Sequence, residues 1–201
     1  MLTRSEYKSK AHQDLKGNWT QPVLATLVYV VVSAASSTPM VGFLILLLIS
    51  LPMGYNYQQL FLEYKRGERD NMVGRLFGFF QDYTRAFGTA FMVTLYTILW
   101  SLLLIVPGII KAIAYSQTYY IAKDHPEYSI DQCIEASKAM MDGHKGEYFV
   151  LWLSFIGWML LGLITFGIGL FWVDPYMQTT FAHYYEDLKN EHPVEMKPEF
   201  A

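Results

Sequence analysis

Residues 148–185 constrain the fold of this chain more than any other feature of the sequence. They form a run of 38 residues that contains one charged side chain, Asp174. A helix needs about 20 apolar residues to cross the hydrocarbon core of a membrane. The run is too long for one crossing and suits two, so the sequence predicts a pair of membrane-spanning helices here.

Two other segments share this lack of charge. Residues 17–62 hold no Asp, Glu, Lys or Arg, and residues 86–122 hold only Lys111. Of the whole chain 16% is charged, whereas a soluble domain usually carries about 25%. Segments of 46 and 37 residues are again long enough for two spans each.

A short stretch rich in Gly, Pro or Ser lies near the middle of each uncharged segment, at 36–42, 106–108 and 166–169. Such residues end helices and form turns. The predicted fold class is therefore all-α: a polytopic membrane bundle of six transmembrane helices, arranged as three hairpins, with amphipathic cytoplasmic helices. The span at 109–123 is short, about 22 Å, so it starts deeper in the membrane or Pro107-Gly108 is a kink.

The basic residues predict the orientation. Fourteen of the fifteen Lys and Arg residues lie in the four polar segments outside the hairpins, and six spans place all four segments on one side. The positive-inside rule makes that side cytoplasmic. We therefore expect a multi-pass protein of the cell (inner or cytoplasmic) membrane with both termini in the cytoplasm.

The whole chain, 1–201, is predicted to form a single membrane domain. Its parts are a cytoplasmic N-terminal segment (1–17), hairpins at 18–62, 87–123 and 147–187, a cytoplasmic or interfacial loop (63–86), a cytoplasmic amphipathic helix (124–146) and a cytoplasmic tail (188–201).

The polar segments differ in what they predict. Residues 3–16 suit either a helix on the membrane surface or a solvated tail. In 63–86, basic residues flank Leu76-Phe77-Gly78-Phe79-Phe80, which favours a helix in the headgroup region over a loop packed under the bundle. In 124–146, Ser129 and Gln132 form a capping-box pattern and Gly143 is a helix stop, which predicts an amphipathic helix packed on the bundle.

Several short motifs resemble a known family. They are Leu15-Lys16-Gly17-Asn18-Trp19, Pro107-Gly108-Ile109-Ile110-Lys111-Ala112, Met141-Asp142-Gly143-His144-Lys145, Leu153-Ser154-Phe155-Ile156-Gly157-Trp158 and Tyr184-Tyr185-Glu186-Asp187-Leu188. In these the chain resembles the bacterial integral-membrane family called domain of unknown function 975. The resemblance implies a multi-pass membrane protein and brings no activity, substrate or catalytic residue.

A shift of 61 residues aligns the second and third hairpins, with Tyr115-Ser116-Gln117-Thr118 on Tyr176-Met177-Gln178-Thr179. The alignment suggests a repeated hairpin, as in many membrane folds. It also defines a candidate intramembrane polar site, because polar residues spaced i, i+3, i+4 and i+7 share a helix face. Its members are Tyr115, Thr118, Tyr119, Tyr176, Thr179, Thr180, His183, Lys111 and Asp174. The site is either a small polar cavity or a set of interhelical hydrogen bonds.

Lys111 and Asp174 are the only charges inside the predicted spans. A charge in a bilayer centre costs about 2.5–3.5 kcal/mol. Because both lie near the predicted outer turns, we expect that they either pair with each other or reach water and headgroups separately.

No motif of a known enzyme class is present, so no enzymatic activity, cofactor or metal is predicted. No basic face stands apart from the membrane-proximal loops, which argues against nucleic-acid binding. Membrane lipid is the expected partner, together with other membrane proteins or a second copy in a homo-oligomer. Two functions fit the sequence: a structural or accessory membrane protein that assembles with partners, and, as the alternative, a binding or transport module for a small solute or lipid.

Overall fold

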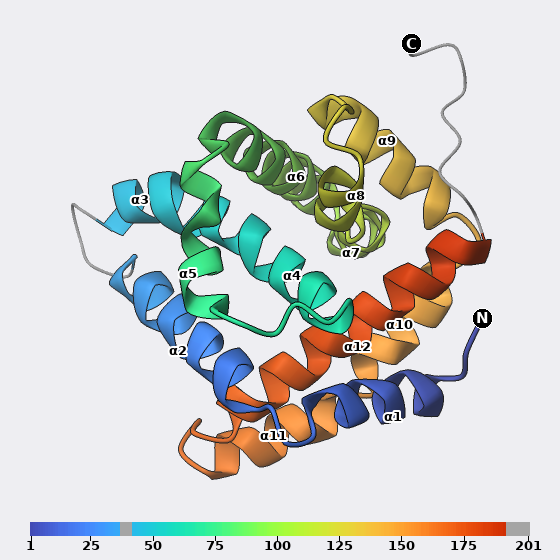
Figure 1. The fold of residues 1–201 in the computed structure, drawn as a ribbon. Coiled ribbons are helices and arrows are strands. Elements are labelled where there is room, and N and C mark those ends of the chain that lie inside the picture. The colour runs from blue at the N-terminus through green and yellow to red at the C-terminus, as the bar shows by residue number, and fades with distance from the viewer. Residues whose placement is uncertain (37–41, 192–201) are drawn as a thin grey trace.

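A computed structural model describes residues 1–36 and 42–191, and over these residues the chain is helical and contains no strand (Figure 1). The all-α fold class is therefore confirmed. The elements in chain order are α1 (Arg4–Leu15), α2 (Thr20–Ala35), α3 (Gly42–Ile45), the π-helix η1 (Leu46–Ser50), α4 (Leu51–Lys65), α5 (Met72–Leu76), the 3-10 helix η2 (Phe77–Phe80), α6 (Tyr83–Leu103), α7 (Ile105–Ala114), α8 (Thr118–Asp124), α9 (Ile130–Met140), α10 (Lys145–Leu153), α11 (Ile156–Ile164) and α12 (Leu170–Glu191).

Helices α4 and α12 organise the packing. Helix α4 lies against α2, α5, α6, α8 and α12, and helix α12 also packs on α1, α2 and α11 (Figure 1). Aromatic and aliphatic side chains of both helices are fully buried, among them Phe61 and Tyr64 of α4 and Tyr185 and Leu188 of α12. The core is therefore formed by segments that are far apart in the sequence.

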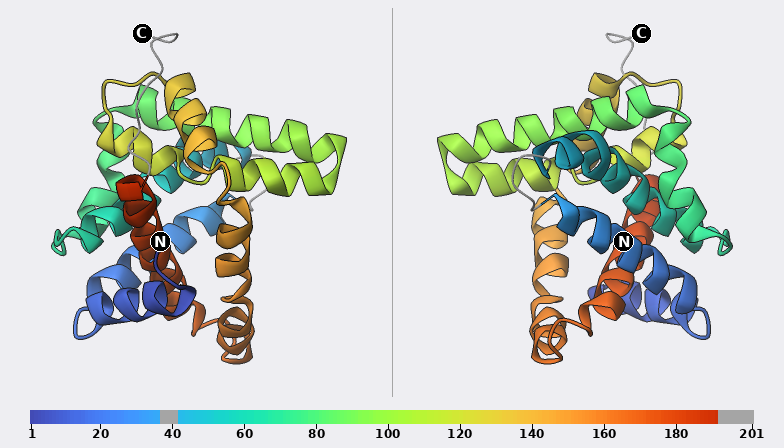
Figure 2. Two further views of the ribbon diagram at one scale, coloured as in Figure 1. Left: turned by 90° about the vertical axis from the view of Figure 1, so that its right-hand side faces the viewer. Right: turned by 90° about the vertical axis from the view of Figure 1, so that its left-hand side faces the viewer.

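The hairpins leave this core in different directions. Figure 2 shows α6 and α7 side by side, extending sideways from the body of the molecule, whereas α10 and α11 run nearly perpendicular to them. Among the described residues, one helical segment, Lys145–Ile164, has the length and composition of a membrane span, and Thr20–Ala35 is a shorter apolar helix. The number of spans therefore remains a prediction of the sequence.

The turn predicted at 106–108 is wrong by a few residues. The chain turns at Leu104, which is extended (φ −160°, ψ 144°), and α7 already begins at Ile105. Pro107 lies in the first turn of α7, where its missing N–H costs little. Gly108 permits the close crossing of α6, because a Cβ atom there would lie 2.4 Å from Ser101 Oγ.

The other two turns have different outcomes. The turn at 166–169 is confirmed, since Phe166 and Gly167 have positive φ angles of 54° and 82° between α11 and α12. The turn at 36–42 falls largely on residues 37–41, which lie outside the described residues. The break between α7 and α8 at residues 115–117 has no counterpart in the continuous α12, so the sequence repeat is not matched by a repeat of helix geometry.

The helix predicted in 124–146 is confirmed as α9. Ser129 caps it, and the Gln132 side chain accepts a hydrogen bond from the Ser129 N–H at 2.7 Å, which completes the capping box. The chain leaves the helix through Gly143, whose φ is +81°. Buried Cys133 and Met140 face the bundle, so this helix packs on it as predicted.

The two remaining polar segments pack against the bundle. Helix α1 buries Tyr7, Ala11 and Leu15 against α12, so residues 3–16 form a docked helix and not a solvated tail. In 63–86 the headgroup helix is only partly supported. Phe79 is buried in the core while Phe80 is 63% exposed, so this loop packs largely under the bundle.

Candidate functional site

The polar residues predicted on α12 make local contacts. The hydroxyl groups of Thr179 and Thr180 donate to the carbonyl oxygens of Pro175 and Tyr176, at 2.8 and 2.7 Å. The ring of Tyr176 meets Phe155 edge-on, and His183 Nε2 lies 2.7 Å from Asp14 of α1. Tyr176 and His183 therefore contact the α10–α11 segment and α1, whereas the two threonine hydroxyl groups bond within α12.

The polar residues predicted on α7 and α8 have other neighbours. Tyr115 is buried beside Tyr96, with ring centroids 6.3 Å apart, and Tyr119 meets Tyr55 of α4 edge-on at 5.4 Å. The Thr118 hydroxyl is buried without a hydrogen-bond partner. The structure thus divides the predicted site into two sets that serve different interfaces, because α8 and α12 reach α4 from different sides.

The pairing of Lys111 with Asp174, one of two alternatives that the sequence left open, does not form. Lys111 Nζ lies 4.6 Å above the ring of Trp100, within the α6–α7 hairpin. Asp174 Oδ2 is hydrogen-bonded to the hydroxyl of Tyr57, and Asp174 Oδ1 accepts from Gln178 at 3.5 Å. The pairing assumed that α7 and α12 are neighbours, but α12 packs on α2 and α4 while α7 packs chiefly on α6.

Asp174 belongs instead to a cluster contributed by three helices, α2, α4 and α12. The Tyr57 hydroxyl lies 2.7 Å from the Thr26 hydroxyl, which is 2.9 Å from the carbonyl oxygen of Pro22. The ring of Tyr29 stacks on Tyr57 with centroids 4.2 Å apart. Sequence reasoning missed Thr26 and Tyr57. The only signal was their hydroxyl groups within an otherwise apolar segment.

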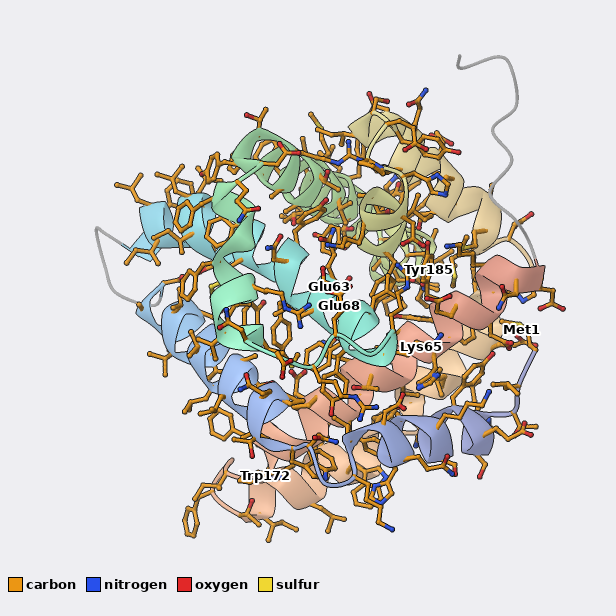
Figure 3. The ribbon with its side chains drawn as sticks, in the orientation of Figure 1. Met1, Glu63, Lys65, Glu68, Trp172 and Tyr185 are labelled. Atoms are coloured by element: carbon orange, nitrogen blue, oxygen red, sulfur yellow. The ribbon has the colours of Figure 1, made fainter. Side chains whose placement is uncertain are left out.

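Charged groups gather at the other end of α4 and α12. Arg66 donates two hydrogen bonds to Asp124, at 2.6 and 2.7 Å, and a third to Glu186 at 2.6 Å. Lys189 and Tyr185 donate to the same Asp124 carboxylate at 2.6 and 2.9 Å, and Figure 3 shows Tyr185 near this end of α12. Burial raises the pKa of Asp124, but these donors outweigh it and lower that pKa to about 2. We call these five residues the ionic cluster.

A cavity of about 510 Å³ opens beside the ionic cluster, between α4, α5, η2, the start of α6 and the end of α8. Glu63 lies at its wall and accepts from Arg75 at 2.7 Å and from Lys123 (Figure 3). Uncharged amides line the same wall, including Asn56 and Gln59. The cavity is polar, and its charges are balanced by one another.

A second hollow of about 350 Å³ lies between α1, α12 and the end of α4, around His183 and Asp14. Within residues 1–36 and 42–191, no group of three or more His, Cys, Asp or Glu residues is arranged to hold a metal ion. The single cysteine, Cys133, is a buried free thiol.

The sequence matches the family described as "Protein of unknown function (DUF975)" over residues 43–192, well over half of the chain. The chain belongs to this family. Four of the five motifs that carry the resemblance lie in the matched part, and only 15–19 precedes it. DUF975 membership adds no activity to the geometry above. Searches of curated proteins and of solved structures found no match.

Proposed function

We propose that this chain is an integral membrane protein whose three hairpins lie in the bilayer and whose ionic cluster and termini face the cytoplasm. The proposed spans lie within α2, η1 with α4, α6, α7 with α8, α10 with α11, and α12, and those in α8 and α12 end before the residues of the ionic cluster. The inner membrane is the proposed location, with membrane lipid as the partner of the hairpins.

Exposed apolar side chains carry this proposal. Leu102 is 78% exposed, Ile164 is 76% exposed and Phe166 is 99% exposed, and all three lie near the ends of hairpins. Other exposed apolar residues continue over the same hairpins and over α2 and α3: Leu27, Val31, Phe43, Leu44, Leu99, Leu104, Val106, Trp158, Leu160, Leu161, Leu163 and Ile168. A soluble monomer rarely exposes apolar patches beyond a few hundred Å², whereas lipid favours such a surface.

The polar side chains support an accessory or structural role within the membrane. Thr179 and Thr180 bond to their own helix, and the His183 side chain reaches Asp14. Both cavities adjoin the charged ends of the helices rather than the hairpin tips. The contact between His183 and Asp14 joins α12 to α1, as polar contacts between helices do, and we propose assembly with other membrane proteins or with a second copy. The proposal includes neither catalysis nor a nucleic-acid partner.

The second candidate is binding of a small solute or a lipid headgroup in the 510 Å³ cavity. Its volume lies in the range of small-molecule sites, about 300–1,000 Å³. Arg75 and Lys123 there offer positive charge, and Glu63 offers negative charge. A ligand with both signs of charge suits this wall best.

Labelling of introduced cysteines in intact cells tests the membrane proposal. In a Cys133→Ser background, Gly169→Cys should react with an impermeant thiol reagent added outside, and Lys189→Cys should be protected until the cells are opened. The reverse labelling pattern would refute it. The proposal would also fail if both sites were protected in intact cells and both were labelled in a cell lysate from which the membranes had been removed. Purification in mild detergent with mass spectrometry separates the roles: a stoichiometric protein partner favours assembly, and a retained small molecule favours binding.

A further inference from the structure

The cluster of Asp174, Tyr57, Thr26 and the Pro22 carbonyl group contains three hydrogen-bonding contacts in series. Thr26 and Tyr57 are buried, 1% and 2% exposed, so water does not complete their hydrogen bonds. Asp174 forms no ion pair with any Lys, Arg or His of the described residues; its other partner is the neutral Gln178. The carboxyl group therefore lies among neutral groups only.

The number of hydrogen atoms decides the state of this cluster. A hydroxyl group carries one hydrogen, a carbonyl oxygen carries none, and an ionised carboxylate carries none. Three contacts between four oxygen atoms need three hydrogens, but Thr26 and Tyr57 supply only two. With an ionised Asp174, one contact would bring two oxygen lone pairs together, which is unfavourable inside a protein.

We propose that Asp174 is a proton-binding site, occupied in the folded protein at neutral pH. The protonated carboxyl group donates from Oδ2 to Tyr57, Tyr57 donates to Thr26, and Thr26 donates to the Pro22 carbonyl oxygen. Each contact then has one hydrogen, and Gln178 donates to the free Oδ1. The ligand is a proton that binds at Asp174, and one hydrogen-bonded chain from α12 through α4 to α2 holds it there; the Pro22 carbonyl oxygen ends the chain as an acceptor and takes up no proton.

The surroundings fit this assignment. The titratable groups that face Asp174 are tyrosines: Tyr29 on α2, Tyr57 on α4 and Tyr120 on α8. Helix α11 carries no titratable residue, and the contacts from α1 reach α12 farther along, at Tyr176 and His183. Asp174 itself is half-buried. The hydrogen count does not depend on a surrounding bilayer, so this inference stands apart from the proposed function.

Infrared spectroscopy of the full chain in detergent tests the proposal directly. The protein, with ¹³C-labelled aspartate, should show the C=O stretching band of a protonated carboxylic acid at pH 7, and Asp174→Asn should lack it. The exposed Asp142, with its side chain 82% exposed, provides the matched control, since Asp142→Asn should keep the band. Absence of the band from the wild type at pH 7 would overturn the proposal.

Thermal unfolding gives an independent readout. Asparagine also donates a hydrogen bond, so Asp174→Asn should unfold near the wild-type temperature at pH 7. Asp174→Ala should unfold roughly 5 °C lower, because it leaves the buried Tyr57 hydroxyl group without its donor. As the pH rises and the folded carboxyl group loses its proton, the wild type should lose stability relative to Asp174→Asn. A saturable stabilisation by Na⁺, absent from Asp174→Asn, would instead show that a metal cation replaces the proton.

Tyr57→Phe keeps the test decisive if Asp174→Asn does not fold. It removes the acceptor of the carboxyl proton and keeps the ring. The carboxylic acid band should then disappear at a pH about one unit lower than in the wild type. An unchanged titration of the band in Tyr57→Phe would overturn the assigned chain.

Discussion

The ionic cluster and the α6–α7 hairpin are held together in opposite ways. In the cluster, Arg66, Asp124 and Lys189 join α4, α8 and α12, which are distant in the sequence, through hydrogen bonds of 2.6–2.7 Å. In the hairpin, α7 packs chiefly on α6, and Leu102 and Val106 are exposed. The ionic cluster is stabilised by contacts between distant parts of the chain, whereas the hairpin exposes apolar side chains.

The difference shows where the stability of the isolated chain resides. Charged hydrogen bonds and buried aromatic groups fix the end near the termini, so substitutions there act on folding itself. The hairpin ends contribute little buried area, so their apolar surface needs a partner, which we propose to be lipid. Substitutions in the two regions should therefore differ in both magnitude and kind.

The largest effect is expected at Asp124. Its side chain is 6% exposed, and Asp124→Asn removes the carboxylate that Lys189 contacts and leaves Arg66 its contact with Glu186. Removing one partner from a buried ionic network costs about 3–5 kcal/mol. We expect a loss in the lower part of this range, because the side chains of both cations are about one-third exposed. Asp142→Asn, which breaks the exposed pair with Lys145, should change the unfolding free energy little. Unfolding in detergent measures both. Equal losses would show that the cluster is no stronger than a surface pair.

Lowering the pH should remove the same contribution. The folded pKa of Asp124 is about 2, below the usual 3.8, so its stabilisation is present above pH 3.8 and is lost as the pH falls toward 2. The difference in unfolding free energy between wild type and Asp124→Asn should shrink over this window. A difference that stays constant from pH 5 to pH 2 would contradict the lowered pKa.

A middle-sized effect is expected where α6 and α7 cross. In Gly108→Ala the new Cβ atom would lie 2.4 Å from Ser101 Oγ, so the hairpin must shift at a cost of roughly 1–3 kcal/mol. Gly157→Ala is the matched control, because no atom lies within 4 Å of its new Cβ atom and α11 is helical there. The control should be neutral or gain up to about 1 kcal/mol. Similar unfolding midpoints for the two variants would show that α6 and α7 do not cross so closely.

The sequence predicts features that depend on neighbouring residues. The capping box at Ser129, the turn at 166–169 and the helical class follow from local chemistry, and the structure confirms them. The motifs also predicted the family correctly. The turn at Pro107-Gly108 was misplaced because Pro suits the first turn of a helix as well as a turn, and Gly suits a helix crossing.

The partners of polar side chains depend on which helices meet, and one sequence does not reveal this. A pair of Asp174 and Lys111 was one of two alternatives, because a repeat suggested that their helices are neighbours, yet Asp174 contacts Tyr57. The members of the ionic cluster come from positions 66, 124 and 185–189, which no local pattern connects. The arrangement of these polar groups could therefore not be predicted from the sequence.

The smallest effect is expected at the tip between α11 and α12. Phe166 is 99% exposed and has a φ angle of 54°, a conformation that Asn adopts more readily than Phe. Phe166→Asn should therefore change the unfolding free energy in detergent by no more than about 0.5 kcal/mol. Phe61→Asn, at a fully buried position of α4, should cost at least about 3 kcal/mol because it removes core packing and buries an amide. A loss above about 1 kcal/mol for Phe166→Asn would mean that the tip is covered by a second copy or a bound protein in the purified state, since lipid and detergent exchange freely around an exposed ring. The exposed hairpin ends would then be a protein interface and not a lipid-facing surface, and the contrast with the packed core would be one between two kinds of protein contact.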